Sequence, residues 1–542
     1  MYPRLMTGDD GAQTKALASK GSQPTDLDIN TNCYTSNVTT GVIREYWFNI
    51  INSTAAPDGV PRPMMLVNGQ YPGPTIKVNW GDTVKVHVQS NLQDNGTSIH
   101  FHSVQQSFNN QMDGAVSITQ CPIAPGSNYT YVWRAEQYGT SFYHSHFSLQ
   151  AWEGVFGRIV VHGPATAVYD KDLGVLFLND WSHQTFNNIY IEALEVPAVL
   201  RIDTVGQRFR TDIFTGKRYR IHLVNTAINT HFKFSINNHN ITVIASDFVP
   251  IVPFTTNNIP IGMGQRYDII IKTDQPVDNY WLRAVPQSYC TDIVAADNIK
   301  GILHYSGADS TTDPSTTKWN YNSHVYCEDM PMSNLVPALA LDAEISNATY
   351  NNDTIAPMQL GNPGIYLWRV GGRVFNVSWN DPTIRHPTAP TPDDGAIEFP
   401  TPDKWTIFVI TETLGVPHPI HLHGHDFYIL AQGSGALPQN ITFQTKNPPR
   451  RDVAMIPARE DGGYLVIAFP ADNPGAWLLH CHMGFHASAG FAQQIVERRD
   501  EFWRFLDVDL LNRTCVAWDA FAAVNPYGVQ FRGMDGLYES GI

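Results

Sequence analysis

Most of the chain alternates apolar and polar residues, which is the period-two pattern of β-strands. Three segments begin with turn or charged residues and then place an apolar residue at every second position, at residues 81–92, 216–227 and 403–414. Each has a later companion with the same alternation, at residues 129–146, 265–285 and 463–482. This recurring pair predicts an all-β protein built from three consecutive copies of one Greek-key β-sandwich.

Turn-rich segments mark the expected domain boundaries. One predicted strand ends at Gly163-Pro164, and residues 306–337 are rich in Thr, Asp, Ser and Asn. Helical spacing of apolar residues occurs only near the end of the chain, between Phe502 and Phe521, where it predicts a short packing helix. We therefore expect three domains, at residues 30–163, 164–335 and 336–542.

Composition narrows the class of protein. The 542 residues exceed what one hydrophobic core supports, which agrees with several domains. Hydrophobic residues make up 43% of the chain and charged residues 16%, which excludes a disordered or collagen-like protein. The formal charge of −15, without any Lys/Arg run, argues against nucleic acid as a partner. No apolar run reaches the ~18 residues that span a bilayer, so we expect no membrane partner either.

Ten Asn-X-Ser/Thr motifs favour a secreted, extracellular glycoprotein. They begin at Asn37, Asn52, Asn95, Asn128, Asn240, Asn347, Asn352, Asn376, Asn440 and Asn512. Residues 1–30 are polar and lack the apolar core of a signal peptide, so we expect that peptide to be absent from this chain. Six cysteines are too few for a disulfide scaffold of this length, and we expect local staples at most.

Histidine is concentrated in four short runs with the spacing of metal ligands. Of twenty histidines, ten lie in these runs: His100 and His102; His144 and His146; His418, His421 and His423; His480, His482 and His486. On a strand, side chains two positions apart share a face, so each His-X-His motif offers two imidazoles to one place. Neutral imidazole is the commonest metal ligand. Repeat two has NYWLR (residues 279–283) at the matching position, so we expect the metal site between repeats one and three.

The His-Cys-His step at residues 480–482 indicates two metal sites joined through one cysteine. On a strand its two histidines face one side and its cysteine the other. Cys481, His486 and the distant His418 make the trigonal set of an electron-transfer copper, with two imidazoles and one thiolate. Phe491 stands ten residues after the cysteine, where a weak axial Met is expected. Because phenylalanine cannot coordinate, the site should favour Cu(I) and have a raised potential.

A zinc hydrolase site is the competing interpretation. His421, His423 and His425 would bind the zinc, and Asp426 would bridge to it or orient a ligand. This interpretation leaves residues 480–482 unexplained and gives no role to the four histidines of repeat one. The sequence therefore favours copper.

The four runs, HFH, HSH, HPIHLHGHDF and HCHMGFHASAGF, resemble the four copper signatures of the multicopper oxidases across nearly the whole chain. Flanking segments such as residues 80–82, 138–141 and 448–452 are similar to those of laccases from ascomycete fungi. The resemblance implies that each sandwich is a cupredoxin-like domain. It also implies four copper ions: one type 1, one type 2 and two type 3.

The resemblance further implies a ligand set that uses every histidine run. Carried over by motif, the ligands are His418, Cys481 and His486 on type 1, with Phe491 axial; His100 and His421 on type 2; and His102, His144 and His482 on one type 3 ion, with His146, His423 and His480 on the other.

Disulfides and a C-terminal plug also follow from the resemblance. Family disulfides would join Cys121 to Cys515 and Cys290 to Cys327, leaving Cys33 without its usual partner. The last residues, Glu539–Ile542, resemble the processed C-terminus of ascomycete laccases, a tail that enters the channel to the trinuclear copper site. A tail without this contact is the alternative.

The implied activity is that of a laccase-like oxidase. A phenolic donor gives single electrons near His486, and Cys481 passes them through His480 and His482 to the trinuclear cluster. There O2 is reduced to two waters, and four coppers that each store one electron match that stoichiometry.

Two acidic residues are candidates for proton transfer in this reaction. Asp113 resembles the family carboxylate that relays protons to oxygen, and a turn-capping aspartate is the alternative. Pro197 replaces the acid that accepts the phenolic proton, and Glu195 is the nearest substitute.

Several rival functions share these motifs. Changes around the donor pocket, at residues 198–203, motivate a dedicated phenol-coupling oxidase of fungal secondary metabolism, of the pigment or dihydrogeodin type. Gly484 stands where iron-oxidising relatives often carry an acid, which disfavours a ferroxidase, and an ascorbate oxidase is also disfavoured. A copper-free structural array is disfavoured because eleven ligands are intact.

Overall fold

The computed structural model describes residues 15–17, 27–195, 200–201, 209–291, 293–294, 298–320, 326–360, 365–387 and 395–525. Within these residues the strands form six sheets of four to six strands and one two-stranded sheet, β11 (Leu200–Arg201) with β20 (Ile293–Val294). The prediction of an all-β protein is confirmed.

The same strand pairing occurs three times. In each repeat one strand runs parallel to a second, which pairs antiparallel with a third. The triplets are β2 (Ile43–Ala55), β5 (Thr83–Asn91) and β7 (Asn128–Arg134); β10 (Lys171–Leu178), β13 (Arg218–Asn225) and β18 (Arg266–Lys272); and β22 (Thr349–Leu360), β25 (Trp405–Glu412) and β30 (Gly463–Pro470). The second and third strands coincide with the predicted segments, which confirms the threefold repeat.

Shorter strands extend these three sheets at their edges. They are β1 (Lys15–Leu17) and β3 (Arg62–Val67) in the first sheet; β15 (Ile241–Ser246) and β16 (Val249–Thr256) in the second; and β23 (Ile365–Arg369), β27 (Phe427–Ser434) and β28 (Arg450–Arg451) in the third.

A second sheet completes each repeat, and in repeats one and three it carries histidines. These sheets are β4 (Gly73–Asn79), β9 (Phe156–His162), β8 (Gly139–His144) and β6 (His100–Phe101); β12 (Arg210–Ile213), β21 (Lys300–Tyr305), β19 (Asn279–Pro286), β14 (Phe232–Ile236) and β17 (Ile259–Ile261); and β24 (Ile397–Phe399), β32 (Ala492–Glu497), β31 (Gly475–Cys481), β26 (His418–Leu422) and β29 (Val453–Ile456).

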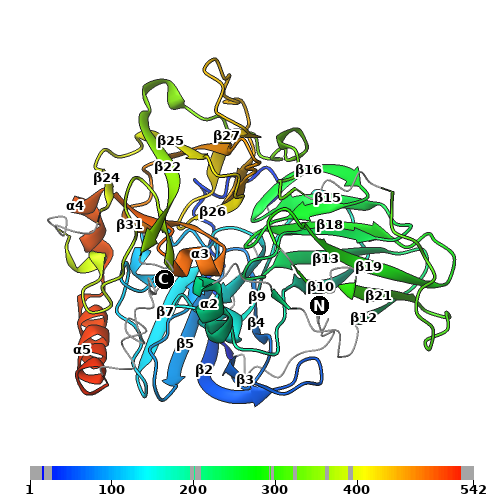
Figure 1. The fold of residues 1–542 in the computed structure, drawn as a ribbon, viewed down its shortest axis with the longest axis horizontal. Coiled ribbons are helices and arrows are strands. Elements are labelled where there is room, and N and C mark those ends of the chain that lie inside the picture. The colour runs from blue at the N-terminus through cyan, green and yellow to red at the C-terminus, as the bar shows by residue number, and fades with distance from the viewer. Residues whose placement is uncertain are drawn as a thin grey trace.

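Apolar side chains join the repeats. Side chains of both sheets of repeat one form one buried cluster, and a larger cluster runs continuously through repeats two and three. In Figure 1 the third repeat (yellow to orange) lies above the first (blue to cyan), and the second (green) lies beside both. The histidine-bearing ends of repeats one and three therefore meet inside the molecule.

The C-terminal helix is confirmed, but the sequence prediction missed another helix. α5 (Val508–Val524) buries Leu511, Cys515 and Trp518, with helical spacing, and Asp507 caps its first turn by accepting a hydrogen bond from the backbone of Leu510. α2 (Phe186–Glu195) was not expected, although buried Phe186, Ile189 and Tyr190 have the same spacing.

The remaining α-helices in the described part of the chain are single turns, α1 (Gln150–Glu153), α3 (Gly484–Ser488) and α4 (Arg499–Phe502). No helix in the described residues is long and apolar enough to cross a membrane.

Candidate metal centre

Cross-strand pairing brings the histidine runs together within repeats one and three. His100 on β6 pairs with His144 on β8, and His421 on β26 pairs with His480 on β31. Contacts between the repeats then join the two pairs: the ring centroids of His100 and His423 lie 4.0 Å apart, and those of His102 and His421 lie 4.1 Å apart.

Eight buried histidines form one cluster. They are His100, His102, His144, His146, His421, His423, His480 and His482. Three sets within the cluster have ligand atoms close enough to share a metal ion: His100 with His421 and His423; His100 with His102 and His144; and His146 with His423 and His480. Two of these sets bring together histidines of repeats one and three.

Hydrogen bonds to backbone carbonyls leave one nitrogen free on three of these rings. Nδ1 of His100 donates to the carbonyl oxygen of Asp113 at 2.7 Å, and Nδ1 of His421 donates to that of Asp452 at 2.8 Å. Nδ1 of His144 likewise donates to the carbonyl of Ser145 at 2.9 Å. A nitrogen that donates to a carbonyl carries the proton, so Nε2 of each ring keeps its lone pair.

Those lone pairs are buried. Nε2 of His100, His144 and His421 has no hydrogen-bond partner among the described residues. Buried polar atoms without partners are costly unless something else binds them, and several imidazole lone pairs converging in one buried cluster fit a group of copper ions.

A second set of possible ligands lies on the opposite side of β31. The Sγ atom of Cys481 is 3.7 Å from Nδ1 of both His418 and His486, and the two Nδ1 atoms are 3.1 Å apart. Because successive side chains on a strand point to opposite faces, Cys481 points away from the His480 and His482 rings, as the sequence predicts. Two imidazoles and one thiol at these distances fit a trigonal copper site.

Aromatic residues surround this second set. The Phe491 ring is fully buried and its centroid lies 4.8 Å from that of His418, so it occupies the neighbourhood of the site without offering a donor atom. The Trp368 ring lies 4.6 Å from that of His486, centroid to centroid. His486 is only half-buried, so this edge of the site is open to a donor.

Burial sets the protonation of both sets. It lowers the pKa of His144 and of His486 to about 3 and that of His480 to about 4, so these imidazoles are neutral and ready to bind a cation. Burial also raises the pKa of the Cys481 thiol well above its usual range, and a bound cation would favour the thiolate.

Asp113 makes direct contact with the histidine cluster. Its side-chain Oδ2 accepts a hydrogen bond from Nδ1 of His423 at 2.8 Å, while its carbonyl holds His100. Its carboxylate is buried and its Oδ1 has no hydrogen-bond partner among the described residues. The side chain therefore faces the cluster and does not cap the turn in which it lies.

The zinc hydrolase alternative does not fit this geometry. His425 turns away from the cluster, with Nε2 2.9 Å from a carboxylate oxygen of Glu497. Asp426 accepts a hydrogen bond at 2.8 Å from the hydroxyl of Tyr34. Neither residue joins a set of possible metal ligands in the described structure.

The sequence prediction gave no role to Asp452, although it quoted the segment that contains it. Besides holding His421 through its carbonyl, Asp452 places Oδ1 3.4 Å from Nε2 of His102. Charged residues 450–452 stand directly before the buried apolar strand β29, and that contrast is the signal that could have marked them.

The disulfide predictions are confirmed, whereas two other candidates cannot be placed. Cys121 is bonded to Cys515 and Cys290 to Cys327, and the unpaired cysteines are Cys33 and Cys481. Glu195 is the last residue of α2, and its side chain lies outside the described residues, as does the whole tail Glu539–Ile542.

Known proteins share this fold and these motifs. Models of the multicopper oxidase family match residues 49–166, 172–308 and 372–501. "Laccase-1" of Botryotinia fuckeliana is 43% identical over 518 residues, covering 92% of this chain and 90% of the relative. "Dihydrogeodin oxidase" of Aspergillus terreus is 36% identical over 541 residues, covering 89% and 88%. The solved laccase of Botrytis aclada matches with a TM-score of 0.86 and 38% identity, covering 95% of this chain and 97% of that one.

The fold and the site together define a copper oxidase made of cupredoxin-like domains. The chain belongs to the multicopper oxidase family. It is a copper-binding oxidoreductase, similar to the fungal laccases, that acts on a small-molecule donor and O2.

Proposed function

We propose that the protein is a laccase-like oxidase that takes single electrons from a phenolic donor and reduces O2 to two waters. Four bound coppers would supply storage of single electrons and reduction of oxygen. The observation that carries the proposal is the position of Cys481, whose sulfur lies between His418 and His486 while its chain neighbours lie in the eight-histidine cluster.

The proposed ligand assignment follows the motifs. His418, Cys481 and His486 would hold the type 1 ion, and the nearby Phe491 offers no further donor atom. His100 and His421 would hold the type 2 ion. The type 3 pair would use His102, His144 and His482 on one side and His146, His423 and His480 on the other. The close approach of the last three supports their grouping, whereas the other close sets of histidines include His100 and so join residues assigned to different ions.

The residues around each set have distinct tasks. His486 and Trp368 form the edge at which a flat phenol ring can approach. Cys481 provides the covalent path from that edge to His480 and His482. Asp113, which holds His423 through its carboxylate, moves protons toward the cluster.

Iron is a poor donor for this site. A side chain at Gly484 would begin with a Cβ 2.6 Å from Trp152 and 2.7 Å from Ile228. No acid therefore fits at the position where iron-oxidising relatives often carry one. This packing supports an organic donor.

Secretion is part of the proposal. Nine of the ten asparagines in Asn-X-Ser/Thr motifs are exposed, and the tenth, Asn95, is half-buried. The exposed asparagines include Asn37, Asn52, Asn128, Asn240 and Asn512. Exposed acceptors fit glycosylation in a secretory compartment.

Oxygen consumption by the copper-loaded enzyme tests the function. With a panel of phenols, ascorbate and ferrous iron, we expect rapid uptake with phenols and four coppers per chain. Cys481→Ser should abolish donor oxidation and the visible absorption of a copper–thiolate pair. Cys33→Ser, which changes the other unpaired cysteine, is the matched control and should keep both. Donor oxidation by Cys481→Ser would contradict the electron path.

The same panel separates a broad laccase from a dedicated phenol-coupling oxidase. The similarity to dihydrogeodin oxidase makes the second function a specific alternative. High turnover of simple phenols supports the laccase, whereas turnover confined to polyketide phenols supports the dedicated enzyme.

A further inference from the structure

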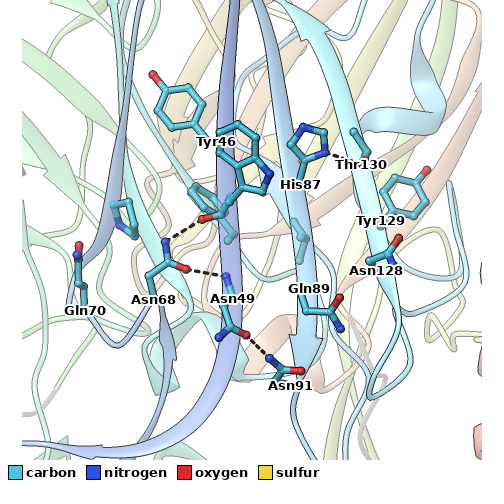
Figure 2. Close-up of a pocket in the computed structure, with 14 residues that line it drawn as sticks. Tyr46, Asn49, Asn68, Gln70, His87, Gln89, Asn91, Asn128, Tyr129 and Thr130 are labelled. Atoms are coloured by element: carbon cyan, nitrogen blue, oxygen red, sulfur yellow. Dashed lines mark hydrogen bonds between the residues drawn. The ribbon is translucent and has the colours of Figure 1, made fainter. Parts of the chain in front are cut away.

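A groove of about 710 Å³ lies on the outer face of the β2–β5–β7 sheet, apart from the metal centre. Strand register arranges its floor in two rows across the three strands. Trp47, His87 and Thr130 form one row, and Asn49, Gln89 and Asn128 form the next. Figure 2 shows Asn128 and Thr130 on the strand beside His87 and Gln89.

One row presents an aromatic surface. Trp47 is 43% exposed, and its ring stacks on that of His87 with centroids 5.2 Å apart and planes at 23°. Nδ1 of His87 lies 3.0 Å from Oγ1 of Thr130, which holds the imidazole in place beneath the groove. A flat, fixed and exposed aromatic surface binds the apolar face of a ring-shaped ligand.

Amide side chains surround this surface and are held by hydrogen bonds. Asn68 accepts a hydrogen bond from the backbone of Asn49 at 2.7 Å and donates one to the carbonyl of Trp47 at 2.8 Å. Asn91 donates to Oδ1 of Asn49 at 2.7 Å. Each of these amides keeps donor or acceptor capacity, and all of them line the groove (Figure 2).

The groove is neutral. Among the described residues that line it there is no Lys, Arg, Asp or Glu. The charged side chains beside the groove, Glu45 and Lys85, lie 3.9 Å from each other, and Glu45 also lies 3.9 Å from Nε2 of His87. The lining fits an uncharged ligand with apolar ring faces and many hydroxyl groups, which is the chemistry of a saccharide.

The chain carries an attachment point for such a ligand inside the groove. Asn128, Tyr129 and Thr130 form an Asn-X-Thr motif, and all three line the groove. Asn128 is exposed, while Tyr129 points into the core. Neighbouring strands lie ~4.8 Å apart, so the strand of Trp47 is ~10 Å from that of Asn128, within reach of a few linked sugar rings. Tethering raises the local ligand concentration to the mM range, so weak contacts suffice.

We infer that Asn128 carries an N-linked glycan whose neutral sugars lie along this groove and pack on the Trp47–His87 stack. The glycan covers the exposed indole and adds a layer over the outer sheet of repeat one. This inference rests on the proposed secretion of the protein.

Two measurements on the secreted, copper-loaded enzyme test the inference. Glycopeptide mass spectrometry should show Asn128 occupied. Oxidative footprinting should show Trp47 protected, with its oxidation rising several-fold in Asn128→Gln. Asn512→Gln removes an exposed motif on α5, far along the chain from the groove, and is the matched control; it should leave Trp47 oxidation unchanged.

A second variant keeps the motif and removes the contact surface. In Trp47→Ala the Asn128 glycan should be released by an endoglycosidase several-fold faster than in the wild type, while release from Asn512 stays the same. Equal release from Asn128 in both proteins would overturn the packing of the glycan on Trp47.

The remaining outcomes separate this inference from the proposed function. An empty Asn128 beside occupied motifs elsewhere would overturn the inference and leave secretion intact. Empty motifs throughout would overturn both. Protection of Trp47 by soluble cellohexaose, in a protein whose Asn128 carries no glycan, would show that the groove binds a free saccharide. That result would overturn the inference of a tethered glycan.

Discussion

The guanidinium of Arg266 donates a hydrogen bond to each carboxylate oxygen of Asp452, both at 2.6 Å. Arg266 lies on β18 in repeat two, whereas Asp452 holds His421 and lies beside His102 in the histidine cluster. Repeat two contributes no histidine to that cluster. Through this ion pair it nevertheless fixes the position of a group that orients two of the histidines.

Arg266→Met should therefore reduce copper binding as well as stability. The substitution leaves the fully buried Asp452 and Asp247 short of a cation, which costs about 3 to 5 kcal/mol of the free energy of unfolding. We expect a lower copper content and weaker visible absorption.

Arg220→Met provides the control, because Arg220 is also a buried arginine of repeat two and pairs with Asp268 at 2.6 Å. It should lower the melting temperature and leave the copper content unchanged. Equal copper content in the two variants would show that the Arg266–Asp452 pair does not orient the cluster.

Asp113→Asn distinguishes proton transfer from a purely structural role in holding His423. Asparagine keeps an acceptor for Nδ1 of His423, but its amide does not exchange protons as a carboxyl group does. We expect the rate of oxygen consumption to fall by a factor of about 10² to 10⁴. Anaerobic electron uptake from the donor, followed by visible absorption, should stay normal. Asp58→Asn, which changes a buried carboxylate bonded to the Trp181 indole, should leave oxygen consumption intact. A fully active Asp113→Asn enzyme would assign Asp113 to a structural role.

Alkaline pH should destabilise repeat two at His222, which pairs with Asp172 on β10 and Asp268 on β18. Burial opposes the charge on this ring, but the Asp268 and Asp172 carboxylates raise its pKa to about 9. Arg220 and His162 lie nearby, and burial lowers the pKa of His162. Because the pKa of His222 is higher in the folded state, its stabilisation is complete below pH 6.5 and is lost as the pH rises through 9.

The measurement is the free energy of unfolding between pH 6 and pH 10, for the wild type and for His222→Gln. The free energy by which the wild type exceeds His222→Gln in stability should shrink by up to about 1.4 kcal/mol per pH unit as the pH rises toward 9. Asp268, whose pKa is lowered chiefly by Arg220 and His222 against the effect of burial, is ionised throughout and adds no slope. A pH-independent difference would exclude His222 as the titrating group.

The Cys121–Cys515 disulfide should hold α5 against repeat one. It joins positions 394 residues apart, whereas Cys290–Cys327 closes a separation of 37. In the chain-entropy model the disulfide that closes the longer loop adds about 2 kcal/mol more to the free energy of unfolding. We expect the Cys121→Ser/Cys515→Ser protein to melt at a lower temperature than the Cys290→Ser/Cys327→Ser protein, and to be cleaved in α5 by protease. The opposite order of melting temperatures would contradict this account.

Local periodicity was enough to predict the repeated strands and the direction in which each ligand candidate points. Side chains alternate across a strand, so the His-Cys-His step had to divide between two sites wherever β31 was placed. The helix α2 was missed because its short apolar stripe, Phe186, Ile189 and Tyr190, competes with a strand pattern that dominates the rest of the chain.

Which residues meet was decided by tertiary packing. The 4.0 Å approach of the His100 and His423 rings and the pairing of Arg266 with Asp452 each join different repeats. Such contacts depend on how the apolar surfaces of whole domains fit together, and no short-range pattern in the chain encodes that fit. The sequence therefore determined the candidate ligands and the opposite faces of β31 on which Cys481 and its neighbouring histidines lie, while the packing of the three repeats decided their partners, protonation and supporting ion pairs.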